Sequence, residues 1–488
     1  MIMKRVFISI LIILQSFVLF AKDYPASLFG IRSDGTTMNT KSIQFAIDHI
    51  SKNGGGRLVF QVGRYLTGTL ILRSNVTLHL KESAVLLGST NPFDYDKYGW
   101  TSMIYAKGQE NIGITGKGII DGRGREVANN YVNLVHKGIF KDPLRYDRTE
   151  ADNRPMLVHL RECENVMIKG VTLKDAASWV QTYDQCKKME IDSIVVDSKA
   201  FWNNDGIDIV DCEDVKVTNS YVDASDDAIC LKSHDPKKSC KNVLISNNKI
   251  RSSANGIKFG TASQGGFENV KITNNIVFDT FRSAIALEAV DGCFLRNVEV
   301  DGLAVYNTGN AIFLRIGERN IGRKSVLENV KISNVYAEIT VNKPDVNYEY
   351  EGPIEDNPRN LSPAIIIAGL KDALVSSVWF DKIVIKHGGG ANRHYANVPL
   401  ESLGLIPEIP AKYPDFSMFK ELPSWAVFIR HAKDIHFKES NFISEKEDFR
   451  KAVVLDQVNN VSFVGTEING KANNEEFFQA NSTQVKFD

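Results

Sequence analysis

The chain has 488 residues, of which 43% are hydrophobic and 24% are charged, as is typical of a folded globular protein. This composition excludes a disordered, collagen-like or disulfide-dense protein. Lys and Arg number 58 and Asp and Glu number 59, so the chain lacks the positive charge that would attract nucleic acid or an anionic membrane. From length alone, about three globular domains are expected.

Residues 1–21 have the pattern of a secretory signal peptide. Lys4 and Arg5 precede an apolar run, and the small residue Ala21 closes it. The run is shorter than the roughly 20 residues that cross a bilayer, and no other segment is long and apolar enough to do so. We therefore expect a mature chain of residues 22–488 that has no membrane span and is exported to the periplasm or the cell exterior.

A motif of the form Asn-Val-x-Ile, followed by a second short apolar run, recurs along the chain. Its clearest copies begin at Cys163, Cys186, Cys212, Cys240, Phe267, Leu295 and Leu327. Successive copies begin 23, 26, 28, 27, 28 and 32 residues apart. This period, with β-branched runs separated by Gly, Asn and Asp, is typical of a solenoid, and the absence of helical periodicity favours an all-β coil.

The repeat therefore predicts an all-β fold, a right-handed parallel β-helix of about ten coils with a short N-terminal capping helix. Because a solenoid grows by stacking, residues 22–488 are expected to form one domain instead of three. Two stretches, 338–370 and 386–428, break the period and are expected to be long loops on one face.

Four of the six cysteines occupy the first position of a motif copy and therefore share one phase of the repeat. We expect them to form a stack of buried thiols, with disulfides as the alternative in an exported protein. None has the paired close spacing of a zinc or redox site.

Acidic residues are densest between 201 and 233. Asp205 and Asp226 are 21 residues apart, close to one coil, so they and Asp227 are expected on one face of neighbouring coils. Mutual repulsion would raise at least one pKa and create a proton donor. Glycoside hydrolysis needs one protonated acid and one ionised carboxylate, whereas the same oxygens could also bind calcium. The expected turn residues in this region are Asp211, Asp214 and Asp223.

The segments WNNDGID and SDDAICLKS resemble the paired signature of glycoside hydrolase family 28, the polygalacturonase family, whose motifs read N-T-D-G-x-D and D-D. Residues 26–68 also resemble the start of these enzymes, where a helix caps the end of the coil. The resemblance covers most of residues 25–340. It implies a right-handed parallel β-helix, the fold that the repeat predicts independently.

The resemblance also implies a role for each matched residue. Asp226 corresponds to the family's general acid, and Asp205 and Asp227 correspond to the pair that activates water, giving inversion with neither metal nor other cofactor. Asn203 and Asp208 fill the remaining motif positions and are expected to orient the site and contact substrate.

The chain departs from the family pattern at two places. Asn255 stands where the family's G-H-G-I-x-x-G has histidine, and the later R-I-K aligns with Ile-Ala-Leu at residues 285–287. In polygalacturonases that Arg and Lys hold the carboxylate of the sugar on the leaving side. Their absence favours a neutral sugar there, such as rhamnose, and hence a rhamnogalacturonan substrate.

Lys232 and Lys258 are candidates to recognise a substrate carboxylate, because Lys232 follows Asp227 by five residues and Lys258 lies one coil later. Solvated surface lysines are the alternative interpretation. Weaker candidates for carboxylate recognition are Arg282, Arg315 and Arg319. Trp179 is a candidate to support a cleft floor, with ordinary core packing as the alternative. His394 and His431 are candidates to line a cleft, and the aromatic stretch 413–425 is a candidate for a cleft wall or sugar platform, with structural roles as the alternative.

Together these features predict a pectin-degrading glycoside hydrolase that cleaves α-galacturonosidic bonds in polygalacturonan or rhamnogalacturonan with inversion. The expected partner is a pectic polysaccharide or oligosaccharide and not nucleic acid, and the protein is expected to be a monomer. Two alternatives stay open, a β-helical pectate lyase, which would need Ca²⁺ and a basic residue, and a non-catalytic carbohydrate-binding β-helix.

Overall fold

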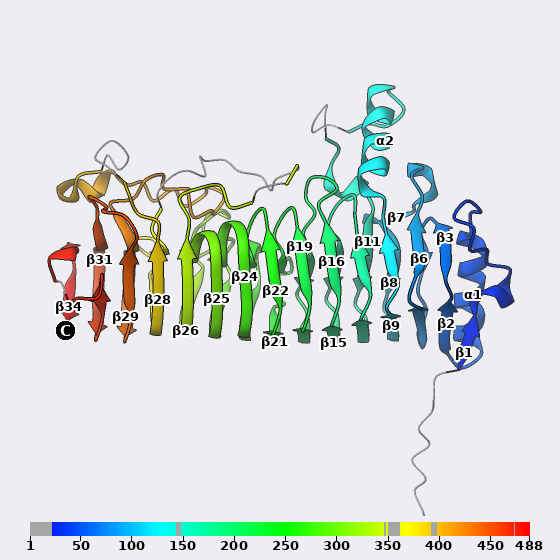
Figure 1. Cartoon of the computed structure of the whole chain (residues 1–488), viewed down its shortest axis with the longest axis horizontal. Coiled ribbons are helices and arrows are strands. Elements are labelled where there is room, and N and C mark those ends of the chain that lie inside the picture. Colours follow the sequence, from blue (N-terminus) through cyan, green and yellow to red (C-terminus); the bar gives the residue numbers. More distant parts are fainter. Residues whose placement is uncertain (1–21, 143–147, 346–347, 350–361, 392–397, 473) are drawn as a thin grey trace, which may run out of the picture.

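The structure, a computed structural model, describes residues 22–142, 148–345, 348–349, 362–391, 398–472 and 474–488. Within these residues the chain forms one long stack of strands, with the N-terminal and C-terminal parts at opposite ends (Figure 1). The predicted signal peptide, residues 1–21, and the candidate His394 lie outside the described residues. No helix in the described part is long and apolar enough to span a membrane.

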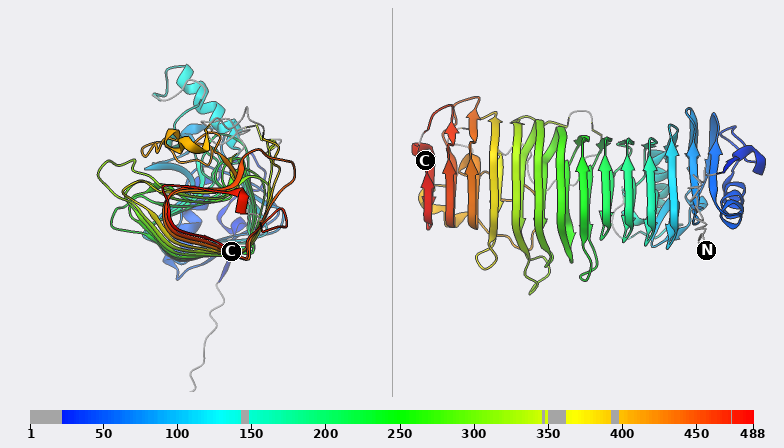
Figure 2. Two further views of the ribbon diagram at one scale, coloured as in Figure 1. Left: turned by 90° about the vertical axis from the view of Figure 1, so that its left-hand side faces the viewer. Right: turned by 90° about the horizontal axis from the view of Figure 1, so that it is seen from below.

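The strands confirm the predicted right-handed parallel β-helix, and its coils superpose when viewed along the stack (Figure 2). Three ladders of parallel strands form its faces. The first ladder contains the repeat motif and comprises β2 (Gly56–Phe60), β5 (Val76–Leu80), β9 (Glu110–Gly116), β12 (Glu164–Lys169), β15 (Lys187–Asp192), β18 (Glu213–Thr218), β21 (Cys240–Ser246), β24 (Gly266–Ala289), β25 (Phe294–Ile316), β26 (Val326–Ile339), β28 (Val375–His387), β29 (Ser424–Lys438), β31 (Lys451–Val464) and β34 (Thr483–Phe487). This ladder is longer than the ten or so coils expected, because its terminal strands match the motif only weakly.

The second and third ladders follow in each coil, and several long strands of the C-terminal half take part in more than one ladder. The second ladder includes β3 (Gly63–Thr67), β6 (Ala84–Gly88), β10 (Ile119–Asp121), β13 (Thr172–Lys174), β16 (Val195–Ser198), β19 (Tyr221–Ala224), β22 (Lys249–Ser252), β30 (Asn441–Ser444) and β32 (Glu467–Ile468). The third includes β4 (Leu70–Ile71), β8 (Trp100–Lys107), β11 (Met156–Arg161), β14 (Gln181–Asp184), β17 (Ile207–Val210), β20 (Ile229–Ser233), β23 (Ile257–Ser263), β27 (Ile365–Ala368) and β33 (Phe477–Ala480). Two short strands complete the inventory, β1 (Asp23–Pro25), which pairs with β2, and β7 (Lys97–Tyr98), which is antiparallel to β8.

The asparagine of the motif has a local structural reason. Asn269, Asn297 and Asn329 have φ angles of 56°, 57° and 55°, in the left-handed region that asparagine tolerates better than most residues. Their side chains also bond from coil to coil, because Nδ2 of Asn297 donates to Oδ1 of Asn269 at 3.1 Å and Asn329 donates to Asn297 at 2.5 Å. The motif asparagine therefore bends the chain within each coil and links successive coils.

The side chains that point inward form one continuous apolar core along the whole stack. Cys163, Cys186, Cys212 and Cys240 are buried in it, and the carbonyl of each of the first three accepts the N–H of the residue that follows the next cysteine of the row. All six cysteines of the chain are free thiols. The predicted stack of buried thiols is thus confirmed.

The predicted capping helix is α1 (Thr40–Lys52), which buries Ile43, Ala46, Ile47 and Ile50 over the first coils (Figure 1). It covers the edge strands that would otherwise expose unpaired backbone groups. A second helix, α2 (Gly124–His136), follows β10 and projects from the side of the stack. The repeat does not predict α2, because this segment is inserted between β10 and β11 and has no counterpart in other coils.

Two long connections join β26 to β27 and β28 to β29. In the second, residues 398–422, here named the covering segment, lie over the outer face of the third ladder. Apolar side chains of the covering segment pack on outward-facing residues of the ladder, which include Phe313, Ile366, Phe428 and Val454. The C-terminal half of this face therefore has a second small hydrophobic core in place of an open surface.

Candidate active site

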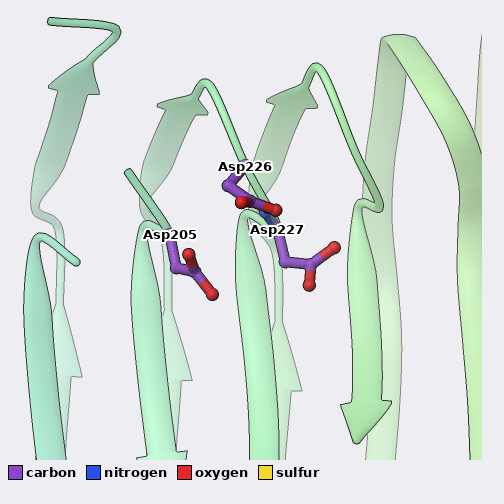
Figure 3. A group of neighbouring side chains, drawn as sticks. All are labelled: Asp205, Asp226 and Asp227. Atoms are coloured by element: carbon purple, nitrogen blue, oxygen red, sulfur yellow. The ribbon is translucent and has the colours of Figure 1, made fainter. Parts of the chain in front are cut away.

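The three aspartates that the coil spacing groups together do converge in the structure (Figure 3). Asp205 lies just before β17, and Asp226 and Asp227 lie just before β20 in the next coil. Ile207 and Ile229 are register partners, so the two turns are aligned along the stack. Each carboxylate places an oxygen within 4.8 Å of the others, and each residue is at most 6% exposed.

A buried asparagine that the sequence did not single out holds the first of these turns. Oδ1 of Asn204 accepts hydrogen bonds from the Ala200 amide and the Ser198 hydroxyl, both at 3.0 Å. Its Nδ2 donates to the Ser178 carbonyl at 2.9 Å, in the preceding coil. Asn204 therefore fixes the backbone beside Asp205. Asn204 could have been singled out from the sequence, because it lies inside the WNNDGID motif.

Asp226 is the candidate that is protonated at neutral pH. Burial, together with the negative charges of Asp205 and Asp227, raises the pKa of Asp226 to about 8. Its Oδ1 accepts the backbone N–H of Asp227 at 2.9 Å. A carboxyl with this pKa can donate a proton at pH 7.

Asp227 is the candidate that is ionised at neutral pH. Burial alone would raise its pKa, but Lys258, Lys232 and Arg282 outweigh that effect and hold the pKa of Asp227 below its ordinary value. The Lys258 ammonium lies 3.0 Å from Oδ2 of Asp227. Nδ2 of Asn255 donates to its Oδ1 at 2.7 Å. Adjacent residues on one turn thus hold a protonated acid and an ionised carboxylate.

Lys232 bridges two other carboxylates of the same site. Its ammonium lies 2.8 Å from Oδ2 of Asp205 and also contacts Asp208. Burial raises the pKa of both aspartates, although Lys232 opposes this shift. Lys232 is only 7% exposed and Lys258 only 1%, so neither is a solvated surface lysine. Both ammonium groups are paired with carboxylates of the site itself.

Asn203, which has a φ of 59°, is tied to a residue two coils earlier, just before β11. Its Oδ1 accepts a hydrogen bond from Nη2 of Arg154 at 2.8 Å. Nη1 of Arg154 donates to the carbonyls of Ala177 and Trp202, both at 2.6 Å. Arg154 is fully buried and was not predicted, because nothing in the repeat marks this position.

The covering segment contributes two further residues to the site. The Lys258 ammonium donates to the Tyr413 hydroxyl at 2.8 Å, and Asp415 forms an ion pair of 2.9 Å with Arg282. Glu288, in the coil after Lys258, lies 3.9 Å from the same ammonium. The sequence marked residues 413–425 only as aromatic, and it marked neither Asp415 nor Glu288.

The structure places the residues aligned with the missing R-I-K. Ile285 and Leu287 point into the core, and Ala286 points outward beside Lys258, its register partner. Alternate residues of a strand face the same way, and Glu288, two residues after Ala286, also faces Lys258. An outward Arg-x-Lys pair at this strand would therefore occupy positions 286 and 288, which are alanine and glutamate, so the basic pair is absent.

The remaining candidate residues bond to other parts of the protein and hold its structure around the site. Arg315 donates to the carbonyls of Glu408 and Ile409 at 2.5 and 3.3 Å, and His431 lies 2.6 Å from Glu408, so both hold the covering segment. Arg319 pairs with Asp291 at 3.0 Å. Bonds typical of turns and coil-to-coil contacts are made by Asp211, Asp214 and Asp223.

Asp205, Asp226 and Asp227 could each offer one oxygen to a metal ion. Calcium prefers six to eight oxygen ligands. Here ammonium groups of Lys232 and Lys258 pair with Asp205 and Asp227, so the protein itself supplies positive charge. The donor set therefore suits proton transfer better than calcium binding.

Comparison with known proteins agrees with this geometry. Residues 59–282 match the family described as glycosyl hydrolases family 28. An exo-poly-alpha-D-galacturonosidase of Dickeya chrysanthemi is 29% identical in an alignment 297 residues long that covers 51% of this chain and 49% of that protein. A probable polygalacturonase of Vitis vinifera is 30% identical in an alignment 232 residues long that covers 43% of this chain and 44% of the other. The chain thus matches about half the length of these curated relatives.

Among solved structures, the family 28 exopolygalacturonase of Yersinia enterocolitica shares the fold, with a TM-score of 0.66 and 20% identity. The aligned part covers 96% of this chain and 78% of that structure. The matched segment 59–282 contains Asp205, Asp226, Asp227 and Lys258. Residues 59–282 thus match the glycosyl hydrolases family 28, and the chain shares the β-helix fold of the Yersinia structure.

Proposed function

We propose that the protein hydrolyses α-galacturonosidic bonds in the backbone of a pectic polysaccharide. The observation that supports this most directly is the contrast in protonation between neighbours, with the pKa of Asp226 at about 8 and that of Asp227 below its ordinary value. Hydrolysis of a glycoside requires one protonated and one ionised carboxyl group at the same bond. Both are present here within one turn.

In the proposed reaction, Asp226 donates its proton to the glycosidic oxygen as the bond from that oxygen to the sugar carbon breaks. Asp227, the ionised member of the water-activating pair that it forms with Asp205, accepts a proton from the water that attacks the same carbon. Lys232 forms an ion pair with Asp205, and Lys258 forms one with Asp227. Asn255 orients Asp227 through a hydrogen bond. The products are two shorter saccharides, and the enzyme is reset when the receiving carboxylate releases its proton to solvent and Asp226 regains one.

Inversion is part of the proposal and rests on the family resemblance. The closest oxygens of the three aspartates lie within 4.8 Å, which is shorter than the 6.5–9.5 Å typical of inverting pairs. The spacing therefore does not itself favour inversion. Proton NMR of the first product formed in D₂O distinguishes the outcomes, since a β-anomer from an α-linked substrate supports inversion and an α-anomer contradicts it.

We further propose action from chain ends. From Ala286 onward, the outer face of the third ladder is covered by the packed side chains of residues 398–422. A polymer therefore cannot lie along the whole face and extend past the aspartates in both directions. The names of the Dickeya and Yersinia relatives as exo-acting enzymes agree with this proposal. Product length against time on polygalacturonan tests it, because internal cleavage would release a ladder of intermediate sizes.

The test of the whole assignment is Asp226→Asn, with Asp214→Asn as the matched control in an exposed turn position of the same region. Loss of general acid catalysis is expected to lower kcat by about 10²- to 10⁴-fold on the cleaved pectic substrate. The control is expected to retain full activity. The wild type should release reducing ends without forming an unsaturated, ultraviolet-absorbing product. This release should continue when a chelator is present. An unsaturated product would support a lyase, and no product from any pectic polymer would support a binding protein.

We also propose that the mature protein begins near residue 22, is exported, and acts as a monomer. The apolar run after Lys4 and Arg5 supports export. Mass spectrometry of the N-terminus of protein recovered from the producing cell and light scattering of the purified chain test these points separately.

A further inference from the structure

A cleft of about 530 Å³ lies beside the proposed catalytic aspartates. It is formed over β11, β14 and β17 of the third ladder, on the N-terminal side of the aspartates and away from the covering segment. None of the residues that line it matches a catalytic position of the family signature. Its walls and floor differ in chemistry, and each restricts what the cleft can bind.

One wall of the cleft is aromatic. The rings of Trp100 and Trp179 stack with centroids 4.5 Å apart and planes 23° from parallel. The Lys232 ammonium lies 4.1 Å from the centre of the Trp179 ring, so this wall reaches the proposed catalytic site. Apart from that ammonium, the paired tryptophans offer a flat apolar surface. The C–H face of a sugar ring can pack on such a surface.

The floor of the cleft presents polar atoms without partners. His159 and Thr182 are register partners on neighbouring strands and line the cleft side by side. Among the described residues, Nδ1 of His159 and Oγ1 of Thr182 have no hydrogen-bond partner, although the two residues are only 3% and 4% exposed. Burial lowers the pKa of His159 to about 4, so the imidazole is neutral at pH 7. Buried unpaired polar groups are costly and point to a polar ligand.

These atoms continue a row that leads to the catalytic site. Thr182 is the register partner of Asp208, whose Oδ2 also has no partner among the described residues, and Oδ1 of Asp205 is unpaired as well. Adjacent strands of the ladder are about 4.8 Å apart. A chain of sugar rings laid along the stack would therefore meet one hydrogen-bonding position in each coil before it reached Asp205.

The charges in the cleft disfavour a second uronate at this position. The guanidinium of Arg161 is paired with Asp184 at 2.9 Å, and Asp235 adds a further negative charge to the lining. Burial lowers the pKa of His234, so this side chain does not supply a compensating cation at neutral pH. A carboxylate in the cleft would thus face at least as much negative as positive charge.

We propose that this cleft binds a neutral sugar of the substrate, next to the sugar whose bond is cleaved, and so selects a backbone in which neutral sugars alternate with galacturonate. The tryptophans contact the apolar face of that sugar, and His159 and Thr182 bond its hydroxyl groups. This inference rests on the proposed hydrolase function. It adds a specificity for rhamnogalacturonan-type chains over homogalacturonan.

The experiment compares two sets of oligosaccharides of equal length, one of galacturonate only and one of alternating rhamnose and galacturonate. Trp100→Ala and Thr182→Val are the test variants, and Thr182→Val keeps the side-chain shape if the tryptophan variant folds poorly. Trp379→Ala is the matched control, since Trp379 is 38% exposed on the first ladder, away from the cleft. The wild type is expected to prefer the alternating set by at least about tenfold in kcat/KM, and each test variant to lose about tenfold on that set alone.

Equal or faster cleavage of the galacturonate-only set by the wild type would overturn the inference, as would equal losses on both sets in the variants. Calorimetric binding of the alternating set to an Asp226→Asn background separates this inference from the proposed function. Binding that Trp100→Ala abolishes, without hydrolysis by the wild type, would retain the sugar site and reject the hydrolase. Hydrolysis of both sets with no effect of either variant would retain the hydrolase and reject the sugar site.

Discussion

Nδ2 of Asn255 lies 2.7 Å from Oδ1 of Asp227, and the backbone nitrogen of Asn255 lies 3.1 Å from the same oxygen. The Oδ1 atom of Asn255 is fixed in turn, because it accepts the Ser283 amide at 3.2 Å. The family pattern has histidine at this position. Asparagine here orients the ionised Asp227 with a side chain that does not titrate.

Asn255→Ala is therefore expected to weaken the reaction without unfolding the protein. A hydrogen bond to a charged group contributes about 1.5–3 kcal/mol, which corresponds to a loss of about 10- to 150-fold in kcat/KM. Steady-state kinetics on the cleaved pectic oligosaccharide measure the loss. Asn242→Ala, at an exposed position of the asparagine row, is the control and should retain activity. Unchanged kinetics in Asn255→Ala would remove Asn255 from the site.

The pH dependence of kcat/KM should be asymmetric about neutrality. Asp226 must be protonated to act as the acid, so activity should fall as pH rises through its pKa of about 8. Asp227 must be ionised, and its pKa is below the ordinary value, so activity should persist well into the acidic range and fall only below it. A profile of kcat/KM against pH, measured with a substrate that is stable on both sides of neutrality, checks the acidic and the alkaline limb. The residual activity of Asp226→Asn should lack the alkaline limb, and an alkaline limb that survives in this variant would contradict the assignment.

Lys258→Met tests whether this lysine acts on Asp227 or on the substrate. Removal of the ammonium 3.0 Å from Asp227 leaves burial less opposed, so the pKa of Asp227 should rise. The acidic limb of kcat/KM is therefore expected to move to higher pH. If Lys258 bound a substrate carboxylate instead, KM would rise and the limb would stay in place. Lys271→Met, a control at a lysine whose side chain is 67% exposed, should change neither.

The fold and the convergence of the aspartates could be predicted because a solenoid repeats its structure in its sequence. The motif asparagine marks a left-handed bend in each coil, and the 21 residues from Asp205 to Asp226 approximate one coil. The same logic predicted the row of cysteines. Periodicity thus gave the positions of residues that belong to the repeating coils.

Contacts made by inserted segments could not be predicted in this way. Tyr413 lies 155 residues after Lys258 in the sequence, and Arg154 lies 49 residues before Asn203. Such distances are set by how an insertion packs on the stack and not by the coil length. The pairing of Lys232 and Lys258 with the aspartates could not be predicted either, since the repeat indicates in which coil each lysine lies but not the direction of its side chain.

The buried cysteines should be chemically inert in the folded protein. Burial raises the pKa of Cys240 and of Cys293 to about 12, so the reactive thiolate is scarce at neutral pH. Ellman's reagent is expected to detect no thiols under native conditions and six in denaturant without reductant. Fewer than six thiols in denaturant would indicate a disulfide and contradict the structure.

Arg315→Leu tests how the covering segment is held on the stack. The buried guanidinium donates to the carbonyls of Glu408 and Ile409, and its loss would leave these groups without partners away from water. The free energy of unfolding in urea is expected to fall by about 2–4 kcal/mol. Arg296→Leu is the control, because this arginine is 45% exposed and its pair with Glu268 on the outer surface should contribute at most about 1 kcal/mol. If the segment closes the site, Arg315→Leu should also release longer products from polygalacturonan and expose residues 398–422 to protease. Equal stability of the two variants would show that Arg315 does not anchor the segment.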